Sequence, residues 1–177
     1  PRPYQLPLLR ALDAGATRAV AVWHRRAGKD KVCLNYLARK TQERVGTYFY
    51  AYPEYGQGKK AIWDGMDRDG FPYLGHFPRE IVKAIDNGDM KMTLKNGSIF
   101  QVVGVSNINA LMSTNPVGVV LSEYSLQDPG GWNYLRPILA ENDGWALFNF
   151  VPRGQNHGYE IFELARSRMA AGDKRWF

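Results

Sequence analysis

Residues 18–30 of the chain read RAVAVWHRRAGKD, and this stretch decides the fold. The apolar run at Arg18–Trp23 predicts a buried strand, and the pattern from Gly28 to Glu43 predicts a helix. A loop between a strand and a helix start directs backbone N–H groups at one point, where the helix dipole adds positive potential. The stretch therefore predicts a phosphate-binding loop at Trp23–Asp30.

Four residues of this loop carry the predicted chemistry. Gly28 lets the backbone approach phosphate closely, and Lys29 is placed to neutralise the β- and γ-phosphates of a nucleotide. Arg25 and Arg26 add cations for the transferring phosphoryl group. We therefore expect this loop to bind ATP.

The loop departs from the pattern G-x-x-x-x-G-K-[ST] at two positions. Trp23 stands at the first glycine, and Asp30 stands where a hydroxyl residue holds magnesium. Taken alone, the stretch also fits a basic strand-to-helix turn in which Asp30 stabilises the helix start.

A second candidate segment is the apolar run Val117–Leu121, which leads into Ser122 and Glu123. Phosphate-loop ATPases place acidic residues at the end of such a strand. Glu123 is the predicted general base, which orients the attacking water; the alternative is an exposed glutamate at a strand end. Asp30 and Ser122 together supply one carboxylate and one hydroxyl, so we hypothesise that both face the same Mg²⁺.

The rest of the chain alternates between strand and helix patterns, which predicts an α/β fold with a mainly parallel central β-sheet flanked by helices. Lys95-Asn96-Gly97 predicts a hairpin with a primed turn, Asp69–Phe77 reads as a loop, and Pro137 is expected to bend or shorten its helix. Further strands are expected at Gly46–Tyr52, Met90–Leu94, Ser98–Val103 and Trp145–Val151, and further helices at Gln57–Asp67, Trp132–Glu141 and Gly158–Ala171.

Composition sets broad limits on function. The chain has 177 residues, a net charge of +6 and one cysteine, Cys33, which we expect in the core. A basic chain favours a polyanionic partner such as nucleic acid. No apolar run is long enough to cross a bilayer, and one cysteine excludes a disulfide framework.

These motifs, in this order, resemble the ATPase domain of the large terminase subunit of tailed bacteriophages over nearly the whole chain. Pro3-Tyr4-Gln5 resembles the adenine-recognition segment of the family, which implies that Gln5 reads the adenine edge and Tyr4 packs near the base. Arg25–Asp30 resembles its phosphate-loop variant, in which Arg25 senses the γ-phosphate. Val119–Tyr124 resembles its acidic strand.

Two further segments carry the resemblance. Phe148–His157 resembles the segment that couples hydrolysis to movement, which implies coupling roles around Asn149, Val151 and Pro152. The family usually has Thr where Val151 stands, and Asn149 is a candidate substitute. The segment before the acidic strand, Val103-Gly104 followed by Ser106-Asn107-Ile108, also resembles the corresponding segment of the family.

The resemblance implies a three-layer P-loop NTPase of ASCE type, with Walker A and Walker B motifs, that uses ATP and Mg²⁺ to drive double-stranded DNA into a procapsid. Expected partners are the portal protein, the small terminase subunit and further copies in a homo-oligomeric ring, in the host cell cytoplasm. We expect residues 1–177 to form one ATPase domain, truncated at its C-terminus and without the nuclease domain.

Two other functions stay open, a helicase-like nucleic-acid-dependent ATPase and a nucleotide- or DNA-binding assembly module without turnover. Arg136 and Arg153 are candidates for an arginine finger. Four lysines are candidates for contacts with DNA phosphates, although solvated surface lysines are the default interpretation: Lys59, Lys60, Lys91 and Lys95.

Overall fold

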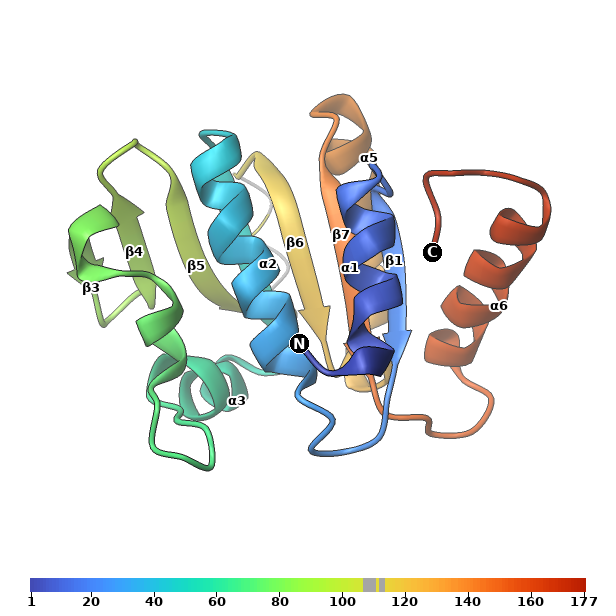
Figure 1. Cartoon of the computed structure of the whole chain (residues 1–177), viewed down its shortest axis with the longest axis horizontal. Helices are drawn as coiled ribbons and strands as arrows, with labels where there is room; N and C mark the ends of the chain where they lie inside the picture. The colour runs from blue at the N-terminus through green and yellow to red at the C-terminus, as the bar shows by residue number, and fades with distance from the viewer. Residues whose placement is uncertain (107–110, 112–113) are drawn as a thin grey trace.

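The computed structural model describes residues 1–106, 111 and 114–177. They form a seven-stranded sheet in the order β1-β7-β6-β2-β5-β4-β3 (Figure 1). The strands β1, β7, β6, β2 and β5 are parallel, and β4 and β3 extend the β5 edge antiparallel. The strands are β1 Arg18–Val22, β2 Thr47–Tyr52, β3 Val82–Asp86, β4 Lys91–Leu94, β5 Ile99–Gly104, β6 Pro116–Ser122 and β7 Trp145–Phe150.

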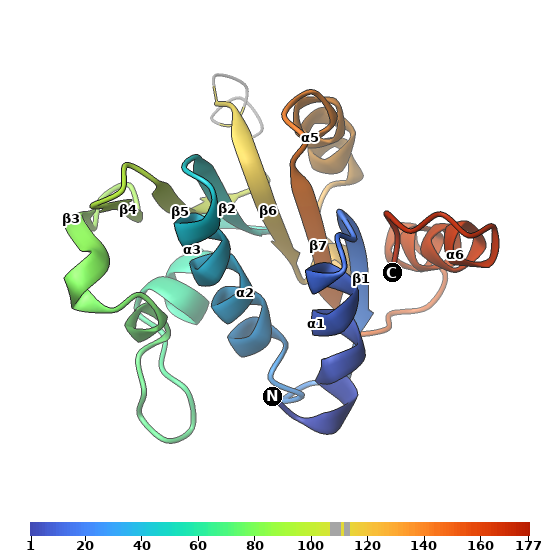
Figure 2. The same cartoon turned by 45° about the horizontal axis from the view of Figure 1, so that its top comes forward.

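Helices cover both faces of the sheet and make three layers (Figures 1 and 2). α1 and α2 pack on one face and α5 and α6 on the other, and each face has its own hydrophobic cluster. The helices are α1 Leu6–Asp13, α2 Lys29–Glu43, α3 Tyr55–Gly58, α5 Pro129–Glu141 and α6 His157–Ala170. The predicted mainly parallel α/β fold is confirmed. Within the described part of the chain, no helix combines the length and apolar character that crossing a membrane requires.

The alternation of side chains along β2 shows how the two faces are divided. Tyr48, Tyr50 and Tyr52 lie in the cluster under α1 and α2, whereas Phe49 and Ala51 lie in the cluster on the opposite face. Successive side chains of a strand point to opposite faces, so the tyrosines form a row beneath α2.

The parallel strands place their carboxyl ends along one edge, the lower edge in Figure 1. β7 lies between β1 and β6, and β2 follows β6. The loops that leave β1, β7, β6 and β2 therefore meet at this edge, which is where open α/β sheets bind ligands.

The last residues cover the outer edge of β1. The Val20 N–H donates to the Phe177 carbonyl (2.7 Å), and the Phe177 N–H donates to the Arg18 carbonyl (2.9 Å). These bonds occupy backbone groups that a bare edge strand leaves open to other chains.

The predicted hairpin is confirmed, but its turn is of another type. Gly97 has φ +95°, whereas Asn96 is not among the residues with positive φ, so the turn is not the primed turn we expected. The Leu94 N–H donates to the Ser98 carbonyl (2.8 Å). The connection is a three-residue loop with glycine in the left-handed position.

The helix predicted over Gln57–Asp67 is wrong in its second half. α3 is followed by a π-helical turn, Lys59–Trp63, and the helix ends there. Asp67 Oδ1 accepts two backbone N–H groups of the loop that follows. Such side chain–backbone bonds give the chain an alternative to helix.

Other differences concern short or exposed elements. The sequence analysis missed α1 and β3, and a 3₁₀ turn, Tyr73–His76, lies within the predicted loop. α5 continues past Pro137 to Glu141, because Leu135 and Leu139 are fully buried on its packed face. The remaining predicted elements agree with the structure to within three residues at each end. Asn107 and Ile108, part of the family-like approach to β6, lie outside the described residues.

The contact between Gly118 and Trp145 generates a stability prediction. A Cβ on Gly118 would lie 2.4 Å from Trp145 Cε2, because the indole covers the partner glycine of the neighbouring strand. We expect Gly118→Ala to lower the free energy of unfolding by about 1–3 kcal/mol, measured by urea denaturation.

Gly56→Ala is the matched control, since a Cβ there meets nothing within 4 Å. It should leave the free energy of unfolding unchanged or raise it by up to about 1 kcal/mol. Equal stability of Gly118→Ala and the wild type would show that the indole does not restrict this position.

Candidate nucleotide-binding site

The loop between β1 and α2 curls through two residues with positive φ. Arg26 has φ +62° and Gly28 has φ +75°. Gly28 is the N-cap of α2, and its carbonyl accepts the Val32 N–H (3.1 Å). Glycine occupies this left-handed position at little cost, and the free N–H groups at the helix start suit an anion.

The amino-terminal segment fixes the loop from one side. Tyr4 Oη and Gln5 Nε2 both donate to the Ala27 carbonyl, at 2.8 and 2.9 Å. Gln5 Oε1 accepts the Arg2 N–H (2.8 Å), so both ends of this buried amide bond within the chain. Anchoring the loop is a role that the sequence analysis did not assign to Gln5, and its adenine role stays a prediction.

Lys29 and Glu123 face each other across the loop. Lys29 is only 6% exposed, and its Nζ lies 3.7 Å from Glu123 Oε1. Glu123 adopts the left-handed conformation, φ +53° and ψ +41°, directly after β6. A non-glycine residue in this region is uncommon and costs energy.

Asp30 and Ser122, the proposed metal ligands, contact each other directly. Ser122 Oγ lies 2.8 Å from Asp30 Oδ1 and 3.2 Å from Asn149 Oδ1. Asn149 Nδ2 donates in turn to the sulfur of Cys33 (3.4 Å). Cys33 is fully buried, as expected for a core residue. The ends of β6 and β7 thus meet the first turns of α2 through a continuous set of polar contacts.

The sequence analysis missed two tyrosines at this site. Tyr50 Oη and Tyr52 Oη donate to Asp30 Oδ1, at 2.7 and 3.3 Å. Burial raises the pKa of both phenols well above 10, so both hydroxyl groups remain protonated donors. The one sequence signal was that Tyr50 and Tyr52 are two residues apart on a predicted strand, which places both side chains on the same face of the sheet.

Gln127 is a third missed residue. Its side chain is 3% exposed, and its Nε2 donates to the carbonyls of Ala51 (3.0 Å) and Ser122 (2.8 Å). It therefore ties together the carboxyl ends of β2 and β6.

The coupling candidates divide between strand and loop. Asn149 is fully buried within β7, whereas Val151 and Pro152 follow the end of the strand. The Val151 carbonyl accepts the Ser125 hydroxyl (3.4 Å). Asn149 is thus the coupling candidate whose side chain contacts Ser122, and the coupling role stays a prediction for all three residues.

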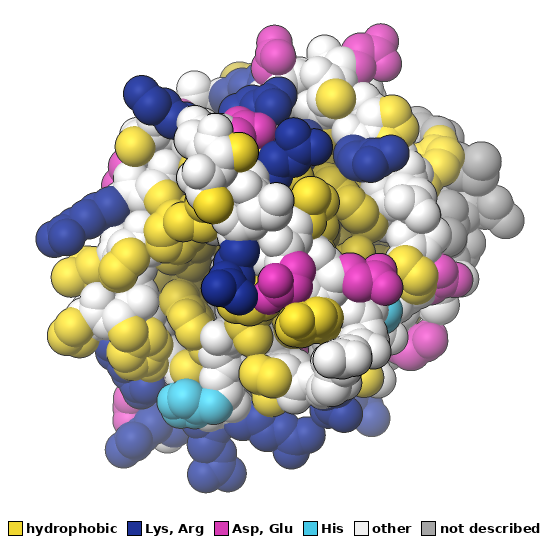
Figure 3. Space-filling model, turned by 90° about the vertical axis from the view of Figure 1, so that its right-hand side faces the viewer, with side chains coloured by type: hydrophobic (Ala, Val, Ile, Leu, Met, Phe, Trp, Pro, Cys, Tyr) yellow, Lys and Arg dark blue, Asp and Glu magenta, His cyan; other side chains and the backbone are white. Residues whose placement is uncertain are grey.

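Pro152 also lines an apolar pocket beside α6, with a volume of about 330 Å³. Val22, Phe150, Tyr159 and Phe162 contribute its apolar wall. Figure 3 views the molecule from the side of α6 and shows hydrophobic side chains around a hollow, with Lys and Arg side chains along the lower edge of the molecule in this view.

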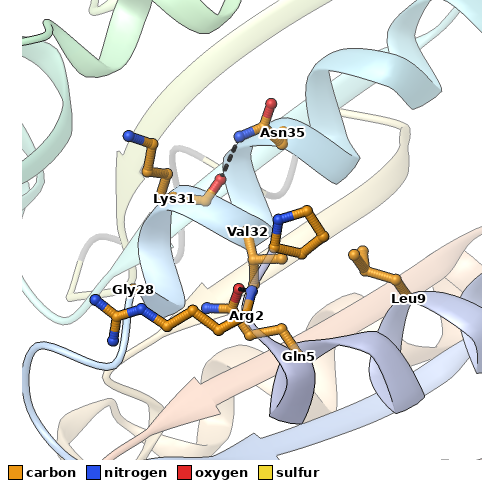
Figure 4. Close-up of a pocket in the computed structure, with 8 residues that line it drawn as sticks. Arg2, Gln5, Leu9, Gly28, Lys31, Val32 and Asn35 are labelled. Carbon is orange, nitrogen blue, oxygen red and sulfur yellow. Dashed lines mark hydrogen bonds between the residues drawn. The ribbon is translucent and has the colours of Figure 1, made fainter.

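A larger cavity of about 670 Å³ opens beside the phosphate loop (Figure 4). It combines apolar surface with polar and charged groups, a composition typical of small-molecule sites. Its lining residues come from the amino-terminal segment, α1, the N-cap of α2 and α2 itself: Pro1, Arg2, Gln5, Leu9, Gly28, Lys31, Val32 and Asn35. Arg25 and Arg26, the cations predicted for the transferring phosphoryl group, are exposed on the adjacent loop.

A glycine-bearing loop and helix start after β1, an acidic residue after β6, and β7 between these two strands define the class: a three-layer α/β fold of ASCE type. Among solved structures, the ATPase domain of the large terminase from Thermus phage P74-26 matches with a TM-score of 0.76 and 21% identity. The match covers 92% of this chain and 69% of that one. The HK97 bacteriophage large terminase matches with a TM-score of 0.73 and 15% identity, over 99% of this chain and 38% of that one.

The large terminase of a thermophilic bacteriophage, solved in complex with ADP, matches with a TM-score of 0.66 and 14% identity, over 84% of this chain and 38% of that one. The same protein has also been solved with ATP-gamma-S. No family model and no curated relative matches the sequence. The chain therefore has the fold of large-terminase ATPase domains, as the resemblance implied.

The anchoring of the Ala27 carbonyl generates a prediction about loop order. Gln5→Ala removes one of two hydrogen bonds to this carbonyl, worth about 1 kcal/mol. We expect hydrogen exchange of the loop amides at residues 25–28 to accelerate about fivefold. Gln57→Ala, at an exposed site in α3, should leave these rates unchanged. Unchanged exchange in Gln5→Ala would show that Tyr4 alone holds the loop.

Proposed function

We propose that this chain binds and hydrolyses Mg-ATP at the carboxyl edge of its sheet. The observation that carries the proposal is the pairing of consecutive residues across the loop: Lys29 with Glu123, and Asp30 with Ser122. A cation, a base and two oxygen ligands beside a helix start are the parts that phosphoryl transfer requires.

Lys29 and Glu123 act as a linked pair in this proposal. An incoming phosphate competes for the Lys29 ammonium group, which Glu123 contacts in the structure. The carboxylate is then released to accept a proton from water and to orient that water for attack. The loop N–H groups and Lys29 hold the charge that develops on the phosphate oxygens.

The donor set suits magnesium, which prefers oxygen ligands and keeps several waters. Asp30 and Ser122 supply a carboxylate and a hydroxyl oxygen that lie 2.8 Å apart. When bound, the metal neutralises phosphate charge. Asp30 and Ser122 thus compensate each other, because the loop carries a carboxylate where a hydroxyl is usual and the strand carries a hydroxyl where a carboxylate is usual.

The base and ribose of the nucleotide fit the cavity of about 670 Å³ beside the loop. Gln5 lines this cavity and also bonds to the Ala27 carbonyl. A nucleotide base there lies next to the residue that orders the loop, so base recognition and loop position are linked.

We further propose that ATP hydrolysis drives double-stranded DNA into a procapsid, in a homo-oligomeric ring with the portal protein and the small terminase subunit. The terminase ATPase fold and the order of the motifs support this motor function. Nucleotide complexes of one protein with this fold support ATP as the substrate. In this proposal Arg25 senses the γ-phosphate, and Asn149, Val151 and Pro152 transmit hydrolysis to movement.

The first prediction tests the hydrolytic site. We expect Lys29→Ala to weaken ATP binding about tenfold or more, because a charge-assisted contact is lost. Glu123→Gln should keep binding and reduce turnover at least about 100-fold. Binding is measured by calorimetry, and turnover by phosphate release.

The controls are Lys40→Ala, at the far end of α2, and Glu141→Gln, at the exposed end of α5. Binding without turnover in the wild type, also after procapsids are added, would favour an assembly module. Strand separation without stimulation by portal-bearing procapsids would favour a helicase-like ATPase. Absence of ATP binding would refute the phosphate-loop assignment.

A second prediction tests the metal ligands. Asp30→Ala and Ser122→Ala should each raise the Mg²⁺ concentration for half-maximal hydrolysis about tenfold. Ser125→Ala is the control, because Ser125 is also buried but its hydroxyl donates to the Val151 carbonyl and not to Asp30. If neither variant changes the Mg²⁺ dependence, the shared metal site is wrong.

A further inference from the structure

We propose that Tyr50 and Tyr52 are positioning residues, which hold the Asp30 carboxylate with one oxygen directed at the divalent cation of the nucleotide. This inference rests on the proposed Mg-ATP function and assigns to two core tyrosines a role in metal binding. Neither hydroxyl is needed to fill the core, because phenylalanine has nearly the same shape.

Three hydroxyl groups converge on a single oxygen of Asp30. Tyr50 Oη (2.7 Å), Ser122 Oγ (2.8 Å) and Tyr52 Oη (3.3 Å) all lie within hydrogen-bond distance of Oδ1. A carboxylate oxygen has about two lone-pair positions, so Oδ1 is fully occupied. No hydrogen bond from the described residues reaches Oδ2, which leaves this oxygen for a further ligand.

The donors are fixed by the sheet rather than by the loop. Tyr50 is fully buried and Tyr52 is 5% exposed, and their rings stack with centroids 5.9 Å apart. Both stand on β2, which pairs with β6, the strand that carries Ser122. Since these side chains pack in the core, the position of each hydroxyl follows from the position of the strands.

This support compensates for the unusual residue in the loop. An aspartate is longer than a serine and has one more torsion angle between the backbone and its oxygens, so it needs orientation from outside the helix. Groups behind a metal ligand fix its orientation, and their loss typically lowers metal affinity by about 10- to 100-fold. The tyrosine hydroxyls occupy this supporting position behind Asp30.

The same strand supplies a matched control. Tyr48 lies on the same face of β2 and is also fully buried. Its hydroxyl donates to the carbonyls of Lys40 (2.9 Å) and Arg44 (2.6 Å), at the other end of α2. Tyr48→Phe therefore removes a hydroxyl with two contacts from the same row without touching Asp30.

The test measures binding of ATP-gamma-S by calorimetry, once with Mg²⁺ and once with EDTA. The dissociation constant in EDTA divided by that in Mg²⁺ reports the contribution of the metal to binding. This ratio does not depend on turnover. We expect Tyr50→Phe to reduce this ratio about tenfold and Tyr52→Phe, with its longer contact, to reduce it less. Binding in EDTA should stay the same in both variants, and Tyr48→Phe should match the wild type.

A double-substitution experiment separates positioning from general destabilisation. Asp30→Asn should abolish most of the metal contribution, and Tyr50→Phe should add no further loss in that background. Thermal unfolding checks that each variant is folded. If Tyr50→Phe proves unstable, the comparison of Tyr52→Phe with Tyr48→Phe decides the question.

The outcomes distinguish the inference from the function on which it rests. If Asp30→Asn lowers the ratio but both tyrosine variants keep the wild-type value, the positioning role is wrong and the metal site stands. If Asp30→Asn leaves the ratio intact, the metal site is wrong and the positioning role fails with it. If the wild type does not bind ATP-gamma-S, the proposed function itself fails. An equal loss in Tyr48→Phe would also overturn the positioning role, because the effect would then be one of core packing.

Discussion

The insertion of β7 between β1 and β6, in parallel register with both, is the constraint on which the rest of the structure depends. It spaces the phosphate loop after β1 from the acidic residue after β6, and it places Asn149 between them. Because all three strands end at the same edge, the side chains that follow them meet without any long connection. The small residue Gly118 permits this arrangement, since the indole of Trp145 lies directly over it.

Sequence patterns were informative where chemistry is local. A strand, a glycine-bearing basic loop and a helix follow one another within residues 18–43, so this strand-loop-helix arrangement could be predicted, and phosphate binding by the loop stays a prediction. α1 was not predicted, because only Leu8 and Leu12 of its eight residues are fully buried and the hydrophobic pattern is short. β3 was not predicted, because four of its five residues are exposed. The contact of Tyr50 with Asp30 could not be predicted, because the lateral order of strands is set by tertiary packing, and nothing in a single sequence says that β2 neighbours β6.

Two consecutive residues at the start of α2 contact two consecutive residues at the end of β6. Residues 29 and 30 of the helix bond to residues 123 and 122 of the strand end, so neighbours on one element meet neighbours on the other. Each contact satisfies a polar group that is otherwise costly to enclose. In the structure the helix start is thus bonded to the sheet by the same groups that the proposed function offers to a nucleotide. Binding would exchange internal partners for ligand atoms, and little new order would be required.

The environment of Cys33 has a practical consequence. This thiol is the sole one in the chain, it is fully buried between α2 and the sheet, and burial raises its pKa far above the ordinary value. Thiolates rather than thiols react with alkylating reagents, so we expect the natural protein not to react with maleimide dyes. A cysteine introduced on an exposed loop would then be the one thiol that takes up the dye. Two introduced cysteines would report the distance between their positions, and Cys33 would not have to be replaced. The core thus leaves the surface free for fluorescence measurements on single molecules.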